Sequence, residues 1–273
     1  MQTILVPIDF SQQARNAASH ASEFAKVFNA KVFLFHAYML PTPVSEVPYV
    51  MVTVDELQKE NENLIKKEAE SLNAQYGIEI EWLVRIGIPS DEIKILTEER
   101  SIDLVVMGMK GVGGLDKIIG STTINAIRKI KVPVLIIPQD SRYSPLKNIT
   151  YATDLHFEMV THSFKTLLSL AKQFHATINI VNVHKENQEP RVDEKEWKNT
   201  IEELFGDIPL AYHSVEDSSV KHGINDFIEK HSSQLLVMIA HKHNFFERIF
   251  SKSQTRSMAY ETRIPLLILH QKN

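Results

Sequence analysis

The stretch that decides the fold is VVMGMKGVGGLDKIIGSTT, residues 105–123. It holds five of the nine glycines of the chain, between Gly108 and Gly120. Apolar, β-branched residues precede the glycines, and Ser121-Thr122 leads from them into a helical pattern. In a parallel α/β sheet this order is typical of an anion site, because glycines let backbone N–H groups approach a ligand and the helix N-terminus adds unpaired donors. The alternative is a flexible surface loop without a ligand.

The composition favours a globular protein of one large or two ordinary domains. The chain has 273 residues, of which 43% are apolar, and a formal net charge of −4. Because there is no basic excess, we expect neither nucleic acid nor a membrane as a partner. There is no cysteine, so disulfides and thiol chemistry are excluded. A strand pattern starts at Thr3 without a leader, and no apolar run approaches the roughly 20 residues of a membrane span, so we expect a cytoplasmic protein.

The chain contains an internal repeat, visible as matching segments in the same order. FAKVFNA (residues 24–30) is echoed by LAKQFHA (residues 170–176), each before an alternating strand pattern. Near the end of each half, KVPVLII is echoed by RIPLLIL. A polar, turn-rich stretch lies between the two copies. The repeat predicts two domains, residues 1–140 and 146–273.

Strand and helix patterns alternate within each half. Apolar runs such as Ile4–Ile8 and Leu104–Met107 predict buried strands, and the alanines between Ser11 and Phe28 predict a helix with Ser11 as its N-cap. A longer helix is expected over Val54–Tyr76. Continuous apolar strands that alternate with helices predict a parallel sheet covered on both faces. The predicted fold class is therefore α/β, with two tandem doubly wound, Rossmann-like domains of five parallel strands in the order 3-2-1-4-5.

Ligands of a doubly wound sheet gather outside the carboxyl ends of its strands. Asp9 follows the first strand, Ala37 ends the second, and the glycine loop follows the fourth. Asp9 can accept hydrogen bonds from a ribose hydroxyl or an adenine amine, whereas Ala37 offers only its backbone. Ser121 and Thr122 can donate to phosphates. For Asp9, Ser121 and Thr122, the alternative is simple capping of the neighbouring helix.

Two common nucleotide motifs are absent. A P-loop needs Gly-Lys-Ser/Thr after the first strand, whereas here Lys110 precedes Gly111 after the fourth. No Gly-x-Gly-x-x-Gly follows the first strand, so the dinucleotide fingerprint is missing as well.

At this point the sequence resembles the universal stress protein family in its tandem two-domain form. The matching pieces are VPID (6–9), His36-Ala37, GIP (87–89), the glycine loop and VPV (132–134). In nucleotide-binding members the loop reads Gly, two residues, Gly, nine residues, Gly, then Ser or Thr. Here eight residues separate Gly111 from Gly120, which either tightens the helix start or misplaces Ser121.

The resemblance implies a set of ligand contacts in the first domain. It places the nucleoside against Pro7, Asp9 and Ala37. It places the phosphates against Gly108, Lys110, Gly111, Gly120, Ser121 and Thr122. The implied nucleotide is ATP, with AMP, ADP and an accompanying Mg²⁺ left open. We predict no catalytic residue and no metal site.

The second domain departs from this pattern. Its loop begins Ala240-His241-Lys242-His243 and ends at Ser253, so side chains replace the glycines where backbone would touch phosphate. Asp154 is retained at the end of the first strand of that half. We therefore predict nucleotide binding in the first domain only. The pair His241-x-His243 lacks an evident third ligand, so a polar loop is favoured over a metal site.

Three functions remain open. The favoured one is an ATP-binding stress-response regulatory protein with an unknown protein partner. The second is a nucleotide-free scaffold for interaction or dimerisation, in which the domains pair within the chain and a homodimer is open. The third is a slow ATPase, but we find no nucleophile and no paired carboxylates, and His36 is better interpreted as a packed, hydrogen-bonded side chain than as an acid or base. We therefore do not expect an enzyme.

Overall fold

The computed structural model describes residues 1–40, 53–109, 121–155, 164–184, 194–240 and 263–270. These residues form alternating strands and helices in two compact units. Of the described residues, the first unit holds 1–109 and 121–132, and the second holds those from 133 onward.

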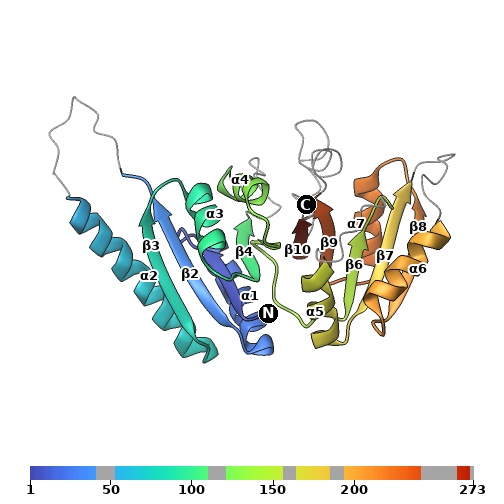
Figure 1. The fold of residues 1–273 in the computed structure, drawn as a ribbon, viewed down its shortest axis with the longest axis horizontal. Coiled ribbons are helices and arrows are strands. Elements are labelled where there is room, and N and C mark those ends of the chain that lie inside the picture. The colour runs from blue at the N-terminus through green and yellow to red at the C-terminus, as the bar shows by residue number, and fades with distance from the viewer. Residues whose placement is uncertain (41–52, 110–120, 156–163, 185–193, 241–262, 271–273) are drawn as a thin grey trace. The chain divides into compact units, whose positions relative to one another are not determined.

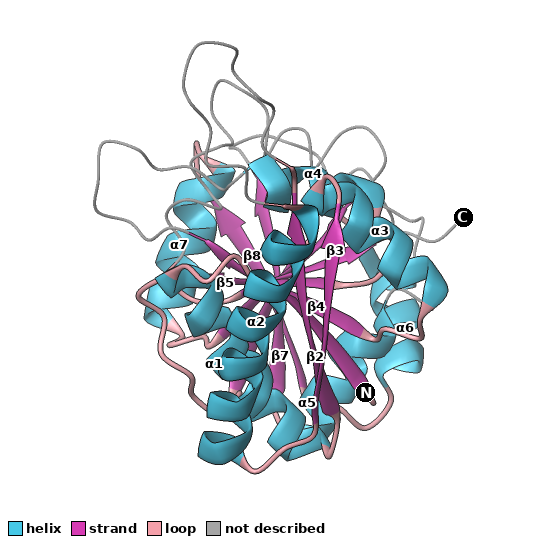
Figure 2. Ribbon diagram, turned by 90° about the vertical axis from the view of Figure 1, so that its left-hand side faces the viewer, coloured by secondary structure: helices cyan, strands magenta, loops and turns pink. Residues whose placement is uncertain are grey.

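The first unit is a parallel sheet covered by helices (Figure 1). Its strands are β1 (Thr3–Pro7), β2 (Lys31–Tyr38), β3 (Ile80–Ile86) and β4 (Leu104–Met109), in the spatial order β3-β2-β1-β4. Its helices are α1 (Gln12–Phe28), α2 (Val54–Tyr76), α3 (Pro89–Glu99) and α4 (Ser121–Lys129). Helix α1 contacts α2, and α3 contacts α4. Right-handed crossovers produce this arrangement, because they place the first two helices on one face of the sheet and the other two on the opposite face. Figure 2 shows α2 lying across β2 and β3.

The second unit repeats this plan. Its strands are β5 (Val134–Pro138), β6 (Asn148–Ala152), β7 (Thr177–His184), β8 (Leu210–Glu216), β9 (Leu235–Ala240) and β10 (Leu266–His270). Its helices are α5 (Lys165–Phe174), α6 (Glu194–Phe205) and α7 (Val220–Lys230). The neighbouring strands β8-β7-β6-β9-β10 are all parallel, and in this direction they have the predicted 3-2-1-4-5 order. The predicted α/β class with largely parallel sheets is confirmed.

Strand β5 makes one pairing that the sequence did not predict. It lies antiparallel to β10, with Leu135 opposite Leu267. Its five residues are all buried, and the first four residues of β10 are buried as well. Pairing these two buried, largely apolar strands satisfies their backbone groups away from water, which is the physical reason for the arrangement.

Helix boundaries follow capping residues that are visible in the sequence. Ser11 caps α1, as predicted, and Asn29 ends it in the left-handed region at φ 49°. Thr53 and Glu56 form a reciprocal capping box at the start of α2. Gly77, at φ 65°, ends that helix. The predicted bounds of α2 are therefore confirmed at both ends.

The repeat extends to unusual backbone angles. Phe10, directly after the Asp9 that follows β1, has φ 61°, and Leu155 has φ 60° at the matching place after β6. Asn29 and His175 end α1 and α5 with φ 49° and 51°. A left-handed residue other than glycine costs about 1–2 kcal/mol, so the same strained turn is built twice.

No helix among the described residues has the length and apolar character that a bilayer crossing requires.

Acid is expected to destabilise the fold through a buried histidine in α1. Burial lowers the pKa of His20 to about 4, from 6.5 when the chain is unfolded. The neutral ring therefore contributes stability above pH 6.5, and this contribution is lost as the pH falls from 6.5 toward 4. By pH 5 the loss amounts to about 2 kcal/mol. Denaturant unfolding at pH 7 and pH 5 measures it.

The matched variants are His20→Gln and His222→Gln. On acidification His20→Gln should lose about 2 kcal/mol less than the wild type. The exposed His222 is bonded to Asp217, which raises its pKa, so its contribution is present below pH 6.5 and lost as the pH rises. His222→Gln should therefore not reduce the acid sensitivity. An identical loss in His20→Gln and the wild type would contradict the assignment.

Candidate functional site

The carboxyl ends of β1, β2 and β4 form one edge of the first unit, because these strands are parallel neighbours. Pro7 ends β1, Ala37 is the penultimate residue of β2, and Gly108 is the penultimate residue of β4. Helix α4 begins at Ser121-Thr122 and lies beyond the end of β4 (Figure 1). The structure thus gathers the predicted strand-end residues at one edge. The predicted contacts Lys110, Gly111 and Gly120 lie outside the described residues.

Asp9 orients the turn that follows β1. Its side chain is exposed, and its Oδ1 accepts hydrogen bonds from the backbone N–H of Ser11 at 3.1 Å and from the Ser11 hydroxyl at 2.5 Å. The Ser11 Oγ in turn accepts the N–H of Ala14 at 3.3 Å and caps α1. The interpretation of Asp9 as the N-cap is therefore wrong. Because a carboxylate has two oxygens, Asp9 can bind Ser11 through one and a ligand through the other.

Three aromatic rings stand beside this turn. His36 is buried, and its Nδ1 lies 2.7 Å from the carbonyl oxygen of Ile8, for which it serves as donor. The ring centroids of Phe10 and Tyr38 lie 4.7 and 6.0 Å from that of His36. The interpretation of His36 as a packed, hydrogen-bonded side chain is confirmed. Sequence reasoning did not single out Phe10, although the repeat of Asp9-Phe10 in Asp154-Leu155 was a signal for a shared turn.

Gly108 has a structural role that the sequence did not reveal. A Cβ at this position would overlap the backbone carbonyl of Gln13, in the first turn of α1, and would lie 3.0 Å from the N of Ala14. The absence of a side chain therefore lets α1 approach β4 closely. This contact is independent of the phosphate contact that the family resemblance implies for Gly108.

Helix α4 presents the first-turn N–H groups of Ser121 and Thr122. Such groups have no partner within their own helix, and together with the helix dipole they favour an anion. The last turn carries the basic residues Arg128 and Lys129. Lys129 pairs with Asp91 and bonds to Ser90, both on α3, which fixes the position of α4. Helix α4 thus begins at Ser121, one residue before the predicted start at Thr122.

The second unit contains a modified copy of this edge. The Thr153 N–H donates to Val181 at 3.0 Å, just as the Ile8 N–H donates to Phe35 at 2.8 Å. Asn182 replaces His36, and its amide donates to the Thr153 carbonyl at 3.0 Å. Asp154 and the strained turn are retained, but Leu155 and Asn182 stand where the first unit has the rings of Phe10 and His36.

Strand register corrects one detail of the sequence comparison. Leu104 pairs with Ile4, and Leu235 pairs with Ile149 at the matching place. Counting along the strands from these pairs aligns Gly108 with the buried Ile239, and not with Ala240. The second unit thus carries a branched side chain where the first has glycine. His241, His243 and Ser253 lie outside the described residues.

The two-fold repeat and the edge geometry agree with a comparison against protein families. The sequence model of the universal stress protein family matches residues 1–138 and again residues 145–270. The chain belongs to the universal stress protein family. Among the described residues, no group of three or more His, Asp or Glu side chains is placed to hold a metal ion.

Individual universal stress proteins align with this chain at moderate identity. Universal stress protein MJ0531 of Methanocaldococcus jannaschii is 29% identical over 147 residues, covering 51% of this chain and 83% of its own length. A universal stress protein structure from Archaeoglobus fulgidus covers 99% of this chain and 98% of its own, with 20% identity and a TM-score of 0.78, and so shares the fold. A universal stress protein solved in complex with cAMP covers 50% of this chain and 96% of its own, with 28% identity and a TM-score of 0.37.

Proposed function

We propose that this universal stress protein is a cytoplasmic stress-response regulator that binds an adenine nucleotide, with ATP as the ligand, in its first domain only. The observation that carries the proposal is the edge where the exposed Asp9 carboxylate, Ala37 and the Gly108 backbone stand together. The N-terminus of α4, at Ser121-Thr122, follows the same strand as the glycine loop. Nucleotides in doubly wound sheets bind at such an edge.

Each end of a nucleotide has a matching group at this edge. The second carboxylate oxygen of Asp9 can accept a hydrogen bond from a ribose hydroxyl or from the adenine amine. The first-turn N–H groups of α4 can donate to phosphate oxygens. In the second domain the Asp154 turn is present, but Ile239 replaces the glycine of the first, which favours one nucleotide per chain.

We propose a binding role in place of catalysis. In the described part of the first unit, the buried His36 is committed to a backbone carbonyl, and Asp9 is engaged with Ser11. The Ser11 hydroxyl beside Asp9 caps α1 by accepting the N–H of Ala14, so we interpret this pair as structural and not as a nucleophile with its base. The alternative function is a nucleotide-free interaction scaffold, which the antiparallel contact of β5 with β10 would serve equally well.

The sharpest test compares Asp9→Asn with Asp154→Asn. An asparagine can still accept the two Ser11 bonds through its amide oxygen, but it replaces the second carboxylate oxygen with a donor. A charge-assisted hydrogen bond contributes about 1.5–3 kcal/mol, so Asp9→Asn should weaken ATP binding about tenfold or more in a calorimetric titration. Asp154→Asn should leave the affinity within about twofold of the wild type. Equal losses from the two variants would refute binding in the first domain only.

Phosphate recognition is tested by titrating ATP, AMP and adenosine, with and without Mg²⁺. If α4 and the glycine loop hold the phosphates, ATP should bind at least about tenfold tighter than AMP. Equal affinities for ATP and AMP would show that the glycine loop does not bind the additional phosphates of ATP. If none of the three binds, and mass spectrometry of the freshly purified protein finds no adenine nucleotide, the scaffold function is favoured.

A further inference from the structure

Strand β3 is the outermost strand of the first unit (Figure 1). The Glu79 carbonyl accepts the Val32 N–H at 3.0 Å, and the Gly87 N–H donates to Tyr38 at 2.8 Å, so the odd-numbered residues of β3 bond to β2. Since backbone groups alternate between the two edges of a strand, those of Ile80, Trp82, Val84 and Ile86 face the outer edge. Four residues therefore offer donors and acceptors to a further strand.

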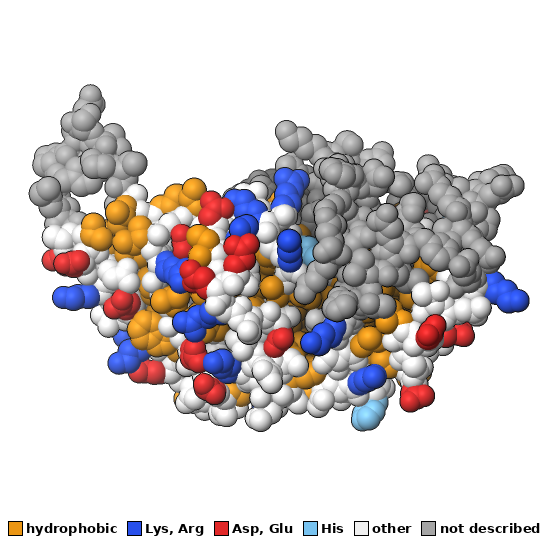
Figure 3. Space-filling model, in the orientation of Figure 1, with side chains coloured by type: hydrophobic (Ala, Val, Ile, Leu, Met, Phe, Trp, Pro, Cys, Tyr) orange, Lys and Arg blue, Asp and Glu red, His pale blue; other side chains and the backbone are white. Residues whose placement is uncertain are grey.

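This edge also carries exposed apolar side chains. Trp82 is 37% exposed and Ile86 is 42% exposed. Among the described residues, every large hydrophobic side chain that is exposed lies between Met39 and Ile95, in the first unit. Figure 3 shows hydrophobic atoms interrupting the charged surface there. The outer strand of the second unit, β8, carries none of these side chains, so a partner that needs apolar contact is favoured at β3.

The sequence of β3, IEWLVRI, is complementary to itself when run antiparallel. With Leu83 opposite Leu83 of a second copy, Glu81 faces Arg85, Trp82 faces Val84, and Ile80 faces Ile86. The even-numbered residues then form the hydrogen-bonded pairs, as their outward backbone groups require. The odd-numbered residues form the pairs without hydrogen bonds, in which side chains approach most closely. Backbone direction and side-chain type thus agree in one register.

The charges around β3 are complementary as well. Glu81 pairs with Lys31 at 2.6 Å and with Arg100 at 3.3 Å, and these three side chains form a positive cluster of net charge +1, with Glu79 acting on Lys31 from outside it. Arg85 pairs with Glu99 at 2.6 Å and with Glu92 at 3.6 Å, which makes a cluster of net charge −1. A two-fold axis through Leu83 would place the positive cluster of one copy beside the negative cluster of the other.

We propose that the outer edge of β3 is a docking surface for a second copy of this chain, joined by antiparallel β3–β3 pairing about Leu83. The pairing extends the first-unit sheets of two copies into one and covers Trp82 and Ile86 in each. It is isologous, so it closes at a dimer. It uses no residue of the proposed nucleotide edge.

Sedimentation of the full chain at about 1–100 µM tests the surface. The wild type should approach twice the monomer mass of 31.2 kDa as the concentration rises. Trp82→Lys puts a charge opposite Val84 at the edge and should weaken the dimer about tenfold or more. Ser214→Lys, on the exposed face of the other outer strand β8, is the matched control and should sediment as the wild type does. A wild type that stays monomeric over this range overturns the proposal.

A charge exchange tests the register. Glu81→Arg alone places two arginines opposite each other at both ends of the pairing, and Arg85→Glu alone places two glutamates there, so each variant should be monomeric. A mixture of the two restores both opposite-charge pairs and should recover the dimer mass. Circular dichroism of each variant confirms folding, and recovery on mixing itself requires two folded partners. A dimer that persists in Trp82→Lys and in both charge variants, or variants that fail to recover on mixing, would show that the copies do not pair through β3 in this register.

Discussion

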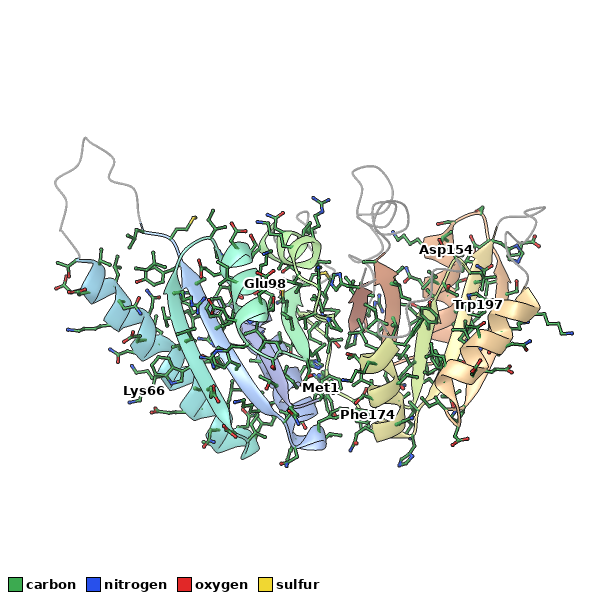
Figure 4. All side chains as sticks on the ribbon, in the orientation of Figure 1. Met1, Lys66, Glu98, Asp154, Phe174 and Trp197 are labelled. Carbon is green, nitrogen blue, oxygen red and sulfur yellow. The ribbon has the colours of Figure 1, made fainter. Side chains whose placement is uncertain are left out.

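Replacing Trp197 by alanine is expected to lower the free energy of unfolding by about 3–5 kcal/mol. Trp197, labelled in Figure 4, is 1% exposed and is among the largest fully buried side chains of the described residues. It lies on α6, with its ring centroid 6.4 Å from that of Tyr212 on β8. Truncation removes the apolar contact between this helix and the outer strand of the second unit and leaves a cavity. Denaturant unfolding monitored by circular dichroism measures the loss.

Trp197→Phe is the control that separates size from polarity. The indole Nε1 is buried and has no hydrogen-bond partner among the described residues. Phenylalanine keeps most of the ring contact, and it removes a buried N–H donor that makes no hydrogen bond. Trp197→Phe should therefore lower the free energy of unfolding by no more than about 1–2 kcal/mol. An alanine variant that unfolds at nearly the same denaturant concentration as the wild type would show that α6 does not depend on this contact.

Gly108→Val is expected to destabilise the first unit by about 3 kcal/mol or more. The new Cβ would overlap the Gln13 carbonyl, which belongs to a helix backbone and cannot rotate away as a side chain can. Helix α1 would have to shift away from β4. Gly77→Ala is the matched control, because Gly77 has open space around it but a left-handed φ of 65°, and should cost only about 1 kcal/mol. If both changes lower the free energy of unfolding equally, Gly108 is not needed for the close approach of α1 to β4.

This prediction also governs how binding data are interpreted. A Gly108→Val protein that fails to bind ATP would not identify a phosphate contact, because the same change disturbs the first turn of α1. Asp9→Asn leaves that packing intact, and it is therefore the better probe of the nucleotide edge.

Local sequence signals predicted the elements well where capping and periodicity agree. Thr53, Glu56 and Gly77 bracket α2, and both of its ends were predicted. The pairing of β5 with β10 could not be predicted, because a continuous apolar run indicates that a strand is buried but does not indicate every strand that pairs with it. The register between β4 and β9 was misjudged by one residue for a similar reason, since apolar runs align almost equally well at neighbouring offsets.

At the candidate site, topology could be predicted and contacts could not. Parallel strand order alone brings Pro7, Ala37 and Gly108 to one edge, so their meeting followed from the periodicities. The link from Asp9 to Ser11 and the packing of Gly108 on Gln13 depend on how a turn and a helix approach each other in space. Neither contact can be deduced from the spacing of residues in the sequence. Whether the shortened glycine loop reaches a phosphate is decided by residues 110–120 and stays a prediction.

Strands β5 and β10 pair in the folded protein, but the ribosome synthesises β5 well before β10. Leu135 and Leu267 face each other, yet about 130 residues separate them in the chain. At about 5–20 residues per second, a ribosome needs on the order of 10 seconds to make that length. For this interval β5 has been synthesised, but the strand that pairs with its β10-facing edge does not yet exist. An apolar strand with one unpaired edge can pair with another chain, so a nascent chain stalled between these two strands is expected to aggregate more readily than the complete chain.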